Sequence, residues 1–160
     1  MKKLLVSTTI ALMLMTVVVS ATFAAPAAGR ELLVKGSIQS LESYAVNFPI
    51  MSVNASGSGH ASQLGNFTVS YSVQVNLLTN EGTGGVAEFV ASNGDRLFAE
   101  GTGQATATTT PGVFNIIEHY TIVGGTGRFD GARGNITLDR TVDITTGVTD
   151  GTMIGTIVHP

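Results

Sequence analysis

Alternating apolar and polar residues dominate the chain after residue 31 and predict β-strands. The clearest case lies within residues 63–78, where every second residue from Phe67 to Val75 is aromatic or Val and the residues between them are Thr, Ser and Gln. A period of two places these sets on opposite faces of a strand. No stretch after residue 31 has a convincing helical period, so we expect an all-β protein.

Eight strands are predicted, separated by turns rich in Gly, Asn, Asp and Pro. Their expected ranges are 32–40, 50–60, 63–78, 85–91, 96–106, 113–123, 133–144 and 152–158. The pair Asn93-Gly94 is a strong signal for a tight hairpin. Eight consecutive antiparallel strands favour an up-and-down β-barrel of the calycin-like type, because closure removes unpaired strand edges. A β-sandwich remains the alternative, since the same periodicity allows it.

A glycine-rich corner at residues 124–134 joins two of the most hydrophobic strands. It contains five glycines in eleven residues, and glycine adopts positive φ without steric cost. The corner resembles a dinucleotide loop only superficially. Asp130 occupies the position of the third glycine, and a strand pattern follows where that motif needs a helix.

The corner Gly124-Gly125-Thr126-Gly127-Arg128-Phe129-Asp130-Gly131-Ala132-Arg133-Gly134 and its continuation to Leu138 resemble the signature shared by plant allene oxide cyclases and dirigent proteins. Residues 89–101 are similar to the preceding hairpin of those families, and residues 64–67 resemble a recurrent element of exported bacterial relatives. The resemblance implies an eight-stranded antiparallel barrel with a cavity along its axis. Arg133 matches an Arg of the dirigent pattern. The first predicted strand, 32–40, offers no match for the cyclase carboxylate, so the resemblance carries the fold and not the activity.

The chain opens with features of a cleaved secretory signal. Lys2 and Lys3 precede the mainly apolar residues 4–19, and Thr22-Phe23-Ala24 fits the small-x-small cleavage rule. We therefore expect a signal peptide at 1–24, a disordered segment at 25–31 and one barrel domain at 32–160. The protein is expected to be secreted or periplasmic, without stable membrane insertion after cleavage.

Removal of the signal leaves six basic residues against eleven acidic ones, a net charge of about −5. This balance argues against nucleic acid as a partner. The sequence has no cysteine, so packing and strand pairing must hold the domain together without disulfides. Three scattered histidines give no metal-ligand spacing. We predict no metal and no cofactor.

Three charged residues, Glu88, Glu118 and Arg140, fall within apolar alternation, with Glu88 between two valines. Glu118 shares a strand face with Tyr120, and Arg140 shares one with Leu138. If these faces point inward, the charges must pair, because an isolated buried charge is costly. A Glu118–Arg140 pair between hairpin neighbours would serve either a ligand cavity or the structure alone, and a one-residue register slip would instead place both charges outside.

Tyrosines combine an apolar ring with a hydroxyl group, so they suit either a ligand cavity or a core in which the hydroxyl is satisfied. The candidate ligand-binding residues are Tyr71, Glu118, Tyr120 and Arg140, to which the dirigent resemblance adds Arg133.

Three functions remain open from the sequence. The first is binding of a small hydrophobic molecule in the barrel without catalysis. The second is a structural or surface-interaction barrel with a filled core. The third is an isomerase of the allene oxide cyclase type, or a dirigent-like protein that controls coupling. The resemblance also suggests a homo-oligomer, since relatives with this fold often form trimers or dimers.

Overall fold

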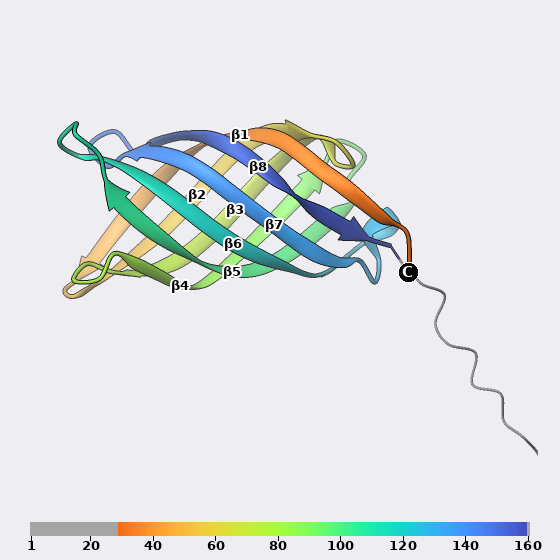
Figure 1. The fold of residues 1–160 in the computed structure, drawn as a ribbon, viewed down its shortest axis with the longest axis horizontal. Helices are drawn as coiled ribbons and strands as arrows, with labels where there is room; N and C mark the ends of the chain where they lie inside the picture. Colours follow the sequence, from red (N-terminus) through yellow and green to blue (C-terminus); the bar gives the residue numbers. More distant parts are fainter. Residues whose placement is uncertain (1–28, 160) are drawn as a thin grey trace, which may run out of the picture.

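The computed structural model describes residues 29–159, which form eight strands and one short 3-10 turn (Figure 1). The strands are β1 (Glu31–Asn47), β2 (Ile50–Ala61), β3 (Gly65–Asn76), β4 (Glu81–Ala91), β5 (Arg96–Ala107), β6 (Val113–Gly125), β7 (Arg133–Asp143) and β8 (Val148–Val158), with the 3-10 turn η1 at Gly127–Phe129. The predicted signal peptide and most of the predicted disordered segment lie outside the described residues. Within residues 29–159, no helix is long and apolar enough to cross a bilayer.

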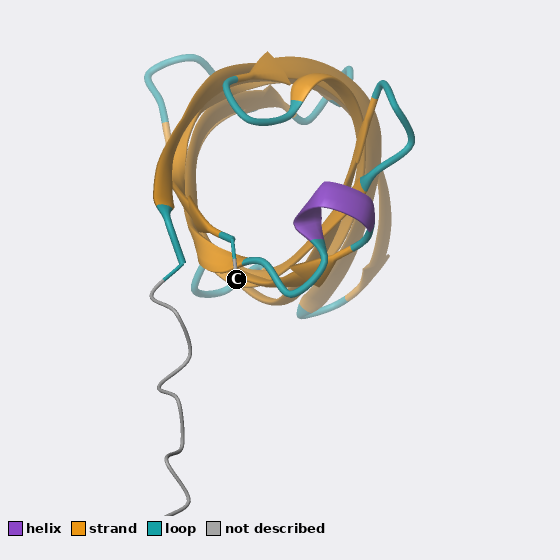
Figure 2. Cartoon of the chain, turned by 90° about the vertical axis from the view of Figure 1, so that its right-hand side faces the viewer, coloured by secondary structure: helices purple, strands orange, loops and turns teal. Residues whose placement is uncertain are grey.

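Each strand pairs antiparallel with the next one in sequence, and β1 pairs with β8 to close the barrel. The closing register runs from Glu31 opposite Val158 to Leu41 opposite Val148. The ring of strands is plain in Figure 2, which also shows η1 at one rim. The all-β class and the up-and-down barrel are therefore confirmed, and the sandwich alternative is wrong.

Several strands have bounds that differ from those expected by two residues or more. β1 extends seven residues beyond the expected end at position 40, and β4 and β8 each begin four residues earlier than expected. β3 is shorter than expected at both ends. The early part of β4 contains an irregularity of register between Gly82 and Gly85, which is why its alternation is hard to recognise in the sequence.

The two ends of the barrel are built differently. The turns β1–β2, β3–β4, β5–β6 and β7–β8 gather at one end, and η1 lies at the other, with the start of β1 and the end of β8 (Figure 1). We call these the turn end and the η1 end. Buried apolar side chains fill the η1 half. Its largest fully buried members are Phe89, Phe129, Leu64, Leu97, Ile122, Ile136, Met153, Ile157 and Val34.

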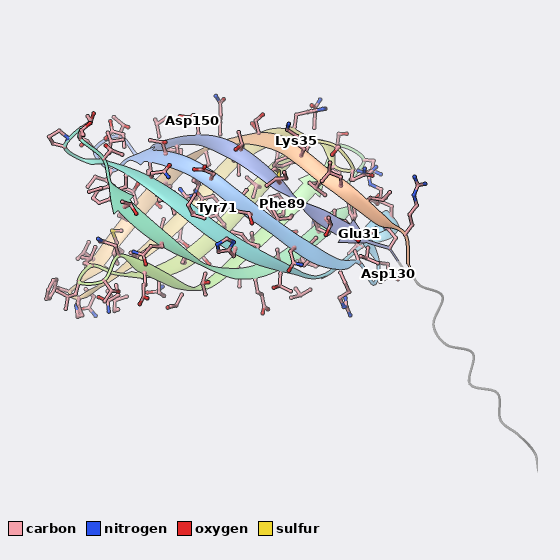
Figure 3. The ribbon with its side chains drawn as sticks, viewed as in Figure 1. Glu31, Lys35, Tyr71, Phe89, Asp130 and Asp150 are labelled. Carbon is pink, nitrogen blue, oxygen red and sulfur yellow. The ribbon has the colours of Figure 1, made fainter. Side chains whose placement is uncertain are left out.

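The rings of Phe67 and Phe89 form the centre of this packed half. They meet edge to face with their centroids 5.6 Å apart, an arrangement that aromatic pairs favour. Figure 3 labels Phe89 and Tyr71 between the strands, with Tyr71 further from the η1 end.

The glycine-rich corner packs against the interior of the barrel at the η1 end. Phe129, at the end of η1, is completely buried, and Arg128 donates a hydrogen bond of 3.0 Å to the carbonyl of Leu64 in the turn opposite. A Cβ on Gly125 would lie 2.3 Å from the carbonyl oxygen of Arg96. Only glycine leaves room for the chain to fold back over the barrel here.

Candidate functional site

The turn half of the barrel contains a cavity of about 270 Å³. This is slightly below the ~300 to 1,000 Å³ of most small-molecule sites. Its wall is predominantly apolar, and small residues line it on β4 and β5, namely Gly82, Gly103 and Ala105. Large apolar residues on the surrounding strands complete the wall; they include Val46, Met51, Val53, Val73, Phe114 and Val142. The barrel is thus packed in one half and hollow in the other.

Charged side chains lie where the cavity meets the packed half. Glu42, Glu118 and Arg140 all line the cavity and are all buried, with 8%, 4% and 3% of their surfaces exposed. Nε and Nη2 of Arg140 donate to the two carboxylate oxygens of Glu118, at 2.8 and 3.0 Å. Nη1 donates to Glu42 and, at 3.2 Å, to Thr149. Arg140 therefore joins two carboxylates through charge-assisted hydrogen bonds.

Tyrosines complete the arrangement around Glu42. The Tyr71 hydroxyl donates to one carboxylate oxygen at 2.8 Å, and the Tyr44 hydroxyl donates to the other at 2.9 Å. Ser40 lies 2.9 Å from the Tyr71 hydroxyl, and the guanidinium of Arg140 lies 5.2 Å from the centroid of the Tyr71 ring. We call Glu42, Glu118, Arg140, Tyr44 and Tyr71 the floor cluster.

Each buried polar side-chain atom of the floor cluster has at least one hydrogen-bond partner. Among the described residues, no buried side-chain nitrogen or oxygen lacks a hydrogen-bond partner. This is the condition under which buried charges are tolerated, because an unpaired one would retain its full desolvation cost.

Burial controls the protonation of the tyrosines. It raises the pKa of all three tyrosines of the chain well above the ordinary value, and a neighbouring glutamate adds to the shift in each case. Burial on its own lowers the pKa of Arg140, but the hydrogen bonds and charge of Glu118, with Tyr71 and Glu42, raise it overall. The phenols therefore stay neutral and the guanidinium stays charged at any physiological pH.

The structure brings four of the five sequence-predicted residues together. Glu118 and Arg140 form the expected pair on adjacent strands, and Tyr71 contacts the same cluster. Tyr120 is buried two residues beyond Glu118 on β6 and shares a side-chain hydrogen bond with it. Neither Tyr71 nor Tyr120 lines the cavity itself. Arg133 lies instead at the η1 end, where Nη1 donates to the carbonyls of Ala132 and Val123, so it does not line the cavity.

Sequence reasoning missed Glu42. The expected first strand ended before it, and the alternation around it is inverted, since Leu41 points outward with 58% of its surface exposed while Glu42 points inward. Thr149 was missed because the expected last strand began after it. The alternation of Ser40, Glu42 and Tyr44 indicates that these three polar residues share one face of the strand, and this pattern could have predicted that Glu42 points inward.

A closed antiparallel barrel with one packed half and one cavity defines the class of this molecule. No protein-family model matches the sequence, and no curated protein matches it. Among solved structures, the pterocarpan synthase dirigent protein GePTS1 is similar, with a TM-score of 0.59 and 14% sequence identity; the match covers 91% of this chain and 98% of that one. This likeness confirms the dirigent-like barrel expected from the corner motif. At this identity it shows the fold alone.

Proposed function

We propose that the protein binds a small, mostly apolar molecule in the turn half of the barrel without transforming it. The observation that carries this proposal is the cavity itself, about 270 Å³ with an apolar wall, above a floor cluster whose polar groups are already satisfied. Apolar concave sites with a few fixed polar groups are typical of ligand binding.

Apolar side chains around the cavity mouth support the same proposal. At the turn end, Val46, Phe48 and Leu78 expose 62%, 69% and 69% of their surfaces, and Ile144 exposes 44%. Exposed apolar residues gathered at one place often mark a binding surface. Here they continue the apolar wall outward, so a hydrophobic molecule would enter without crossing a charged rim.

The cavity also separates this proposal from a purely structural barrel, which would need no hollow half. Unfilled interior space costs dispersion contacts along its lining. A ligand would restore these contacts.

A second candidate is a reaction in the cavity, by an isomerase or a dirigent-like protein. It is favoured by the position of Glu118 and Arg140 on the cavity floor and by the fold shared with a protein described as a pterocarpan synthase. Incubation with any ligand found by screening, followed by chromatography, separates the two candidates. Recovery of unchanged ligand supports binding alone, and a new product supports the second candidate.

The binding proposal is tested with 1-aminoanthracene, a neutral aromatic dye whose fluorescence rises in apolar surroundings. We expect saturable binding of one dye per chain. Ala105→Phe adds a phenyl ring inside the cavity and should weaken binding at least about tenfold. Thr106→Phe adds the same ring at the next position of β5, on the exposed outer face, and should leave affinity unchanged. Absence of saturable binding, or equal affinity in the folded Ala105→Phe variant, would overturn the proposal.

A further inference from the structure

The floor cluster has acceptors to spare and few free donors. A carboxylate offers about four acceptor positions and a guanidinium five N–H donors. Glu42 accepts three hydrogen bonds; Glu118 accepts two from Arg140, which itself makes four, and one from the hydroxyl of Tyr120. The hydroxyl hydrogens of Tyr44 and Tyr71 are already donated to Glu42. A ligand that reaches this floor therefore meets mainly unused lone pairs.

The formal charge of the floor points the same way. Two carboxylates and one guanidinium sum to −1, and Arg140 is the only basic residue among the described residues that line the cavity. In surroundings of low dielectric, such a charge interacts strongly with a charged ligand group. It favours a cation and opposes an anion.

The distribution of charge along the barrel is an independent observation. Apart from Arg140, the basic residues within 29–159 lie toward the η1 end: Arg30 and Lys35 near the start of β1, Arg96 and Arg133 at strand starts, and Arg128 in η1.

The turn end lacks basic residues by contrast. Its four turns, 48–49, 77–80, 108–112 and 144–147, contain no charged residue and no His. Glu81 and Asp143 lie at the strand ends beside them, and Asp150 lies near the start of β8. No basic residue of these turns offsets the negative formal charge of the floor cluster, which favours cations over anions at this end of the barrel.

We infer that the cavity selects small apolar molecules that carry a protonated amino group at their inner end, and that it discriminates against carboxylates. This inference rests on the proposed function and specifies its ligand class. The ammonium group would lie on the floor cluster, donating N–H bonds to the free acceptor positions of Glu42 and Glu118. The apolar tail would extend toward the mouth along Val53, Val73 and Val142.

The test compares three ligands with the same eight-carbon chain: octylamine, 1-octanol and octanoate. Each displaces 1-aminoanthracene from the wild-type protein at neutral pH and low ionic strength. Octylamine should bind at least about tenfold more tightly than 1-octanol, and octanoate at least about tenfold more weakly. Octyltrimethylammonium keeps the charge but has no N–H donor, so it should bind more weakly than octylamine.

Two variants locate the source of the preference. Glu118→Gln and Glu42→Gln each remove one negative charge, and either should reduce the ratio of octylamine to 1-octanol affinity toward one. Glu42→Gln leaves the bidentate Arg140–Glu118 pair intact and is the more conservative change. A full preference for octylamine in a folded variant would overturn the inference. If neither variant folds, the comparison of ligands on the wild-type protein decides alone.

The two proposals fail in different ways. If neither the dye nor 1-octanol binds, the proposed function is wrong. If both bind but octanoate equals or exceeds octylamine, only the inferred ligand class is wrong. Equal binding of octylamine and 1-octanol has the same meaning, since the charge of the floor would then have no effect on selection.

Discussion

Replacing Arg140 with methionine removes the guanidinium shared by Glu42 and Glu118. Methionine keeps an unbranched apolar stem but donates no hydrogen bond. Glu118 then loses both of its bonds from Arg140, Glu42 loses one, and two like charges remain in a buried site. We expect a large loss of stability from the uncompensated charge rather than from lost volume.

The magnitude follows from the burial of the partners. Removing one partner of a buried ion pair typically costs about 3–5 kcal/mol, and all three side chains here are at least nine-tenths buried. Since small domains are stable by about 5–15 kcal/mol in total, this is a substantial fraction of the free energy of unfolding. The midpoint of thermal unfolding should fall by about 10 °C or more.

The assay is urea unfolding followed by far-ultraviolet circular dichroism. Arg96→Met is the matched control, because Arg96 also contacts a glutamate at 2.8 Å, but 53% of its side-chain surface is exposed. An exposed pair of this kind contributes about 0–1 kcal/mol. The two substitutions remove the same charge, but from a buried site with two carboxylates in one case and from an exposed pair with one carboxylate in the other.

A triple variant, Glu42→Gln with Glu118→Gln and Arg140→Met, should recover at least half of the loss. Neutral amides keep acceptors for the tyrosine hydroxyls and remove the repulsion between carboxylates. If Arg140→Met loses no more stability than Arg96→Met, the floor cluster is not energetically buried, and the reasoning about its charge fails with it.

Three further outcomes are expected. Burial is the main cause that raises the pKa of all three tyrosines above the ordinary value of 10.0. Their contribution to the free energy of unfolding is therefore fully present below pH 10 and is lost as the pH rises above 10. In a pH titration, tyrosinate absorbance should rise at a higher pH in the folded protein than in the unfolded chain, and coincident titrations would contradict this. Phe89→Ala should cost about 3–5 kcal/mol in urea unfolding, whereas Phe48→Ala, at a side chain 69% exposed, should change stability by no more than about 0.5 kcal/mol; equal effects would refute the packed half. Gly134→Ala should destabilise by about 1–3 kcal/mol or more, because its φ is +144° and a Cβ would lie 2.0 Å from the carbonyl oxygen of Thr156; an unchanged unfolding midpoint would show that the corner tolerates a side chain.

The sequence by itself determined the strand class, the inward faces of several strands and the place of the corner. These features depend on local rules. Alternation on β3, β6 and β7 assigns Tyr71, Glu118 and Arg140 to the apolar faces, and a short loop makes β6 and β7 neighbours. The pairing of Glu118 with Arg140 was therefore within reach of sequence reasoning.

Only the tertiary structure decided which further residues joined that pair. Glu42 and Arg140 are 98 positions apart, and they meet because closure places β1 beside β8, with β7 next in the ring. Long-range register depends on the whole ring, and a shift of one residue would turn Glu42 outward. Tertiary packing also decided which half is hollow, since that depends on small residues such as Gly103 and Ala105 of β5 facing the interior opposite side chains of other strands that do not fill the space, rather than on any local pattern.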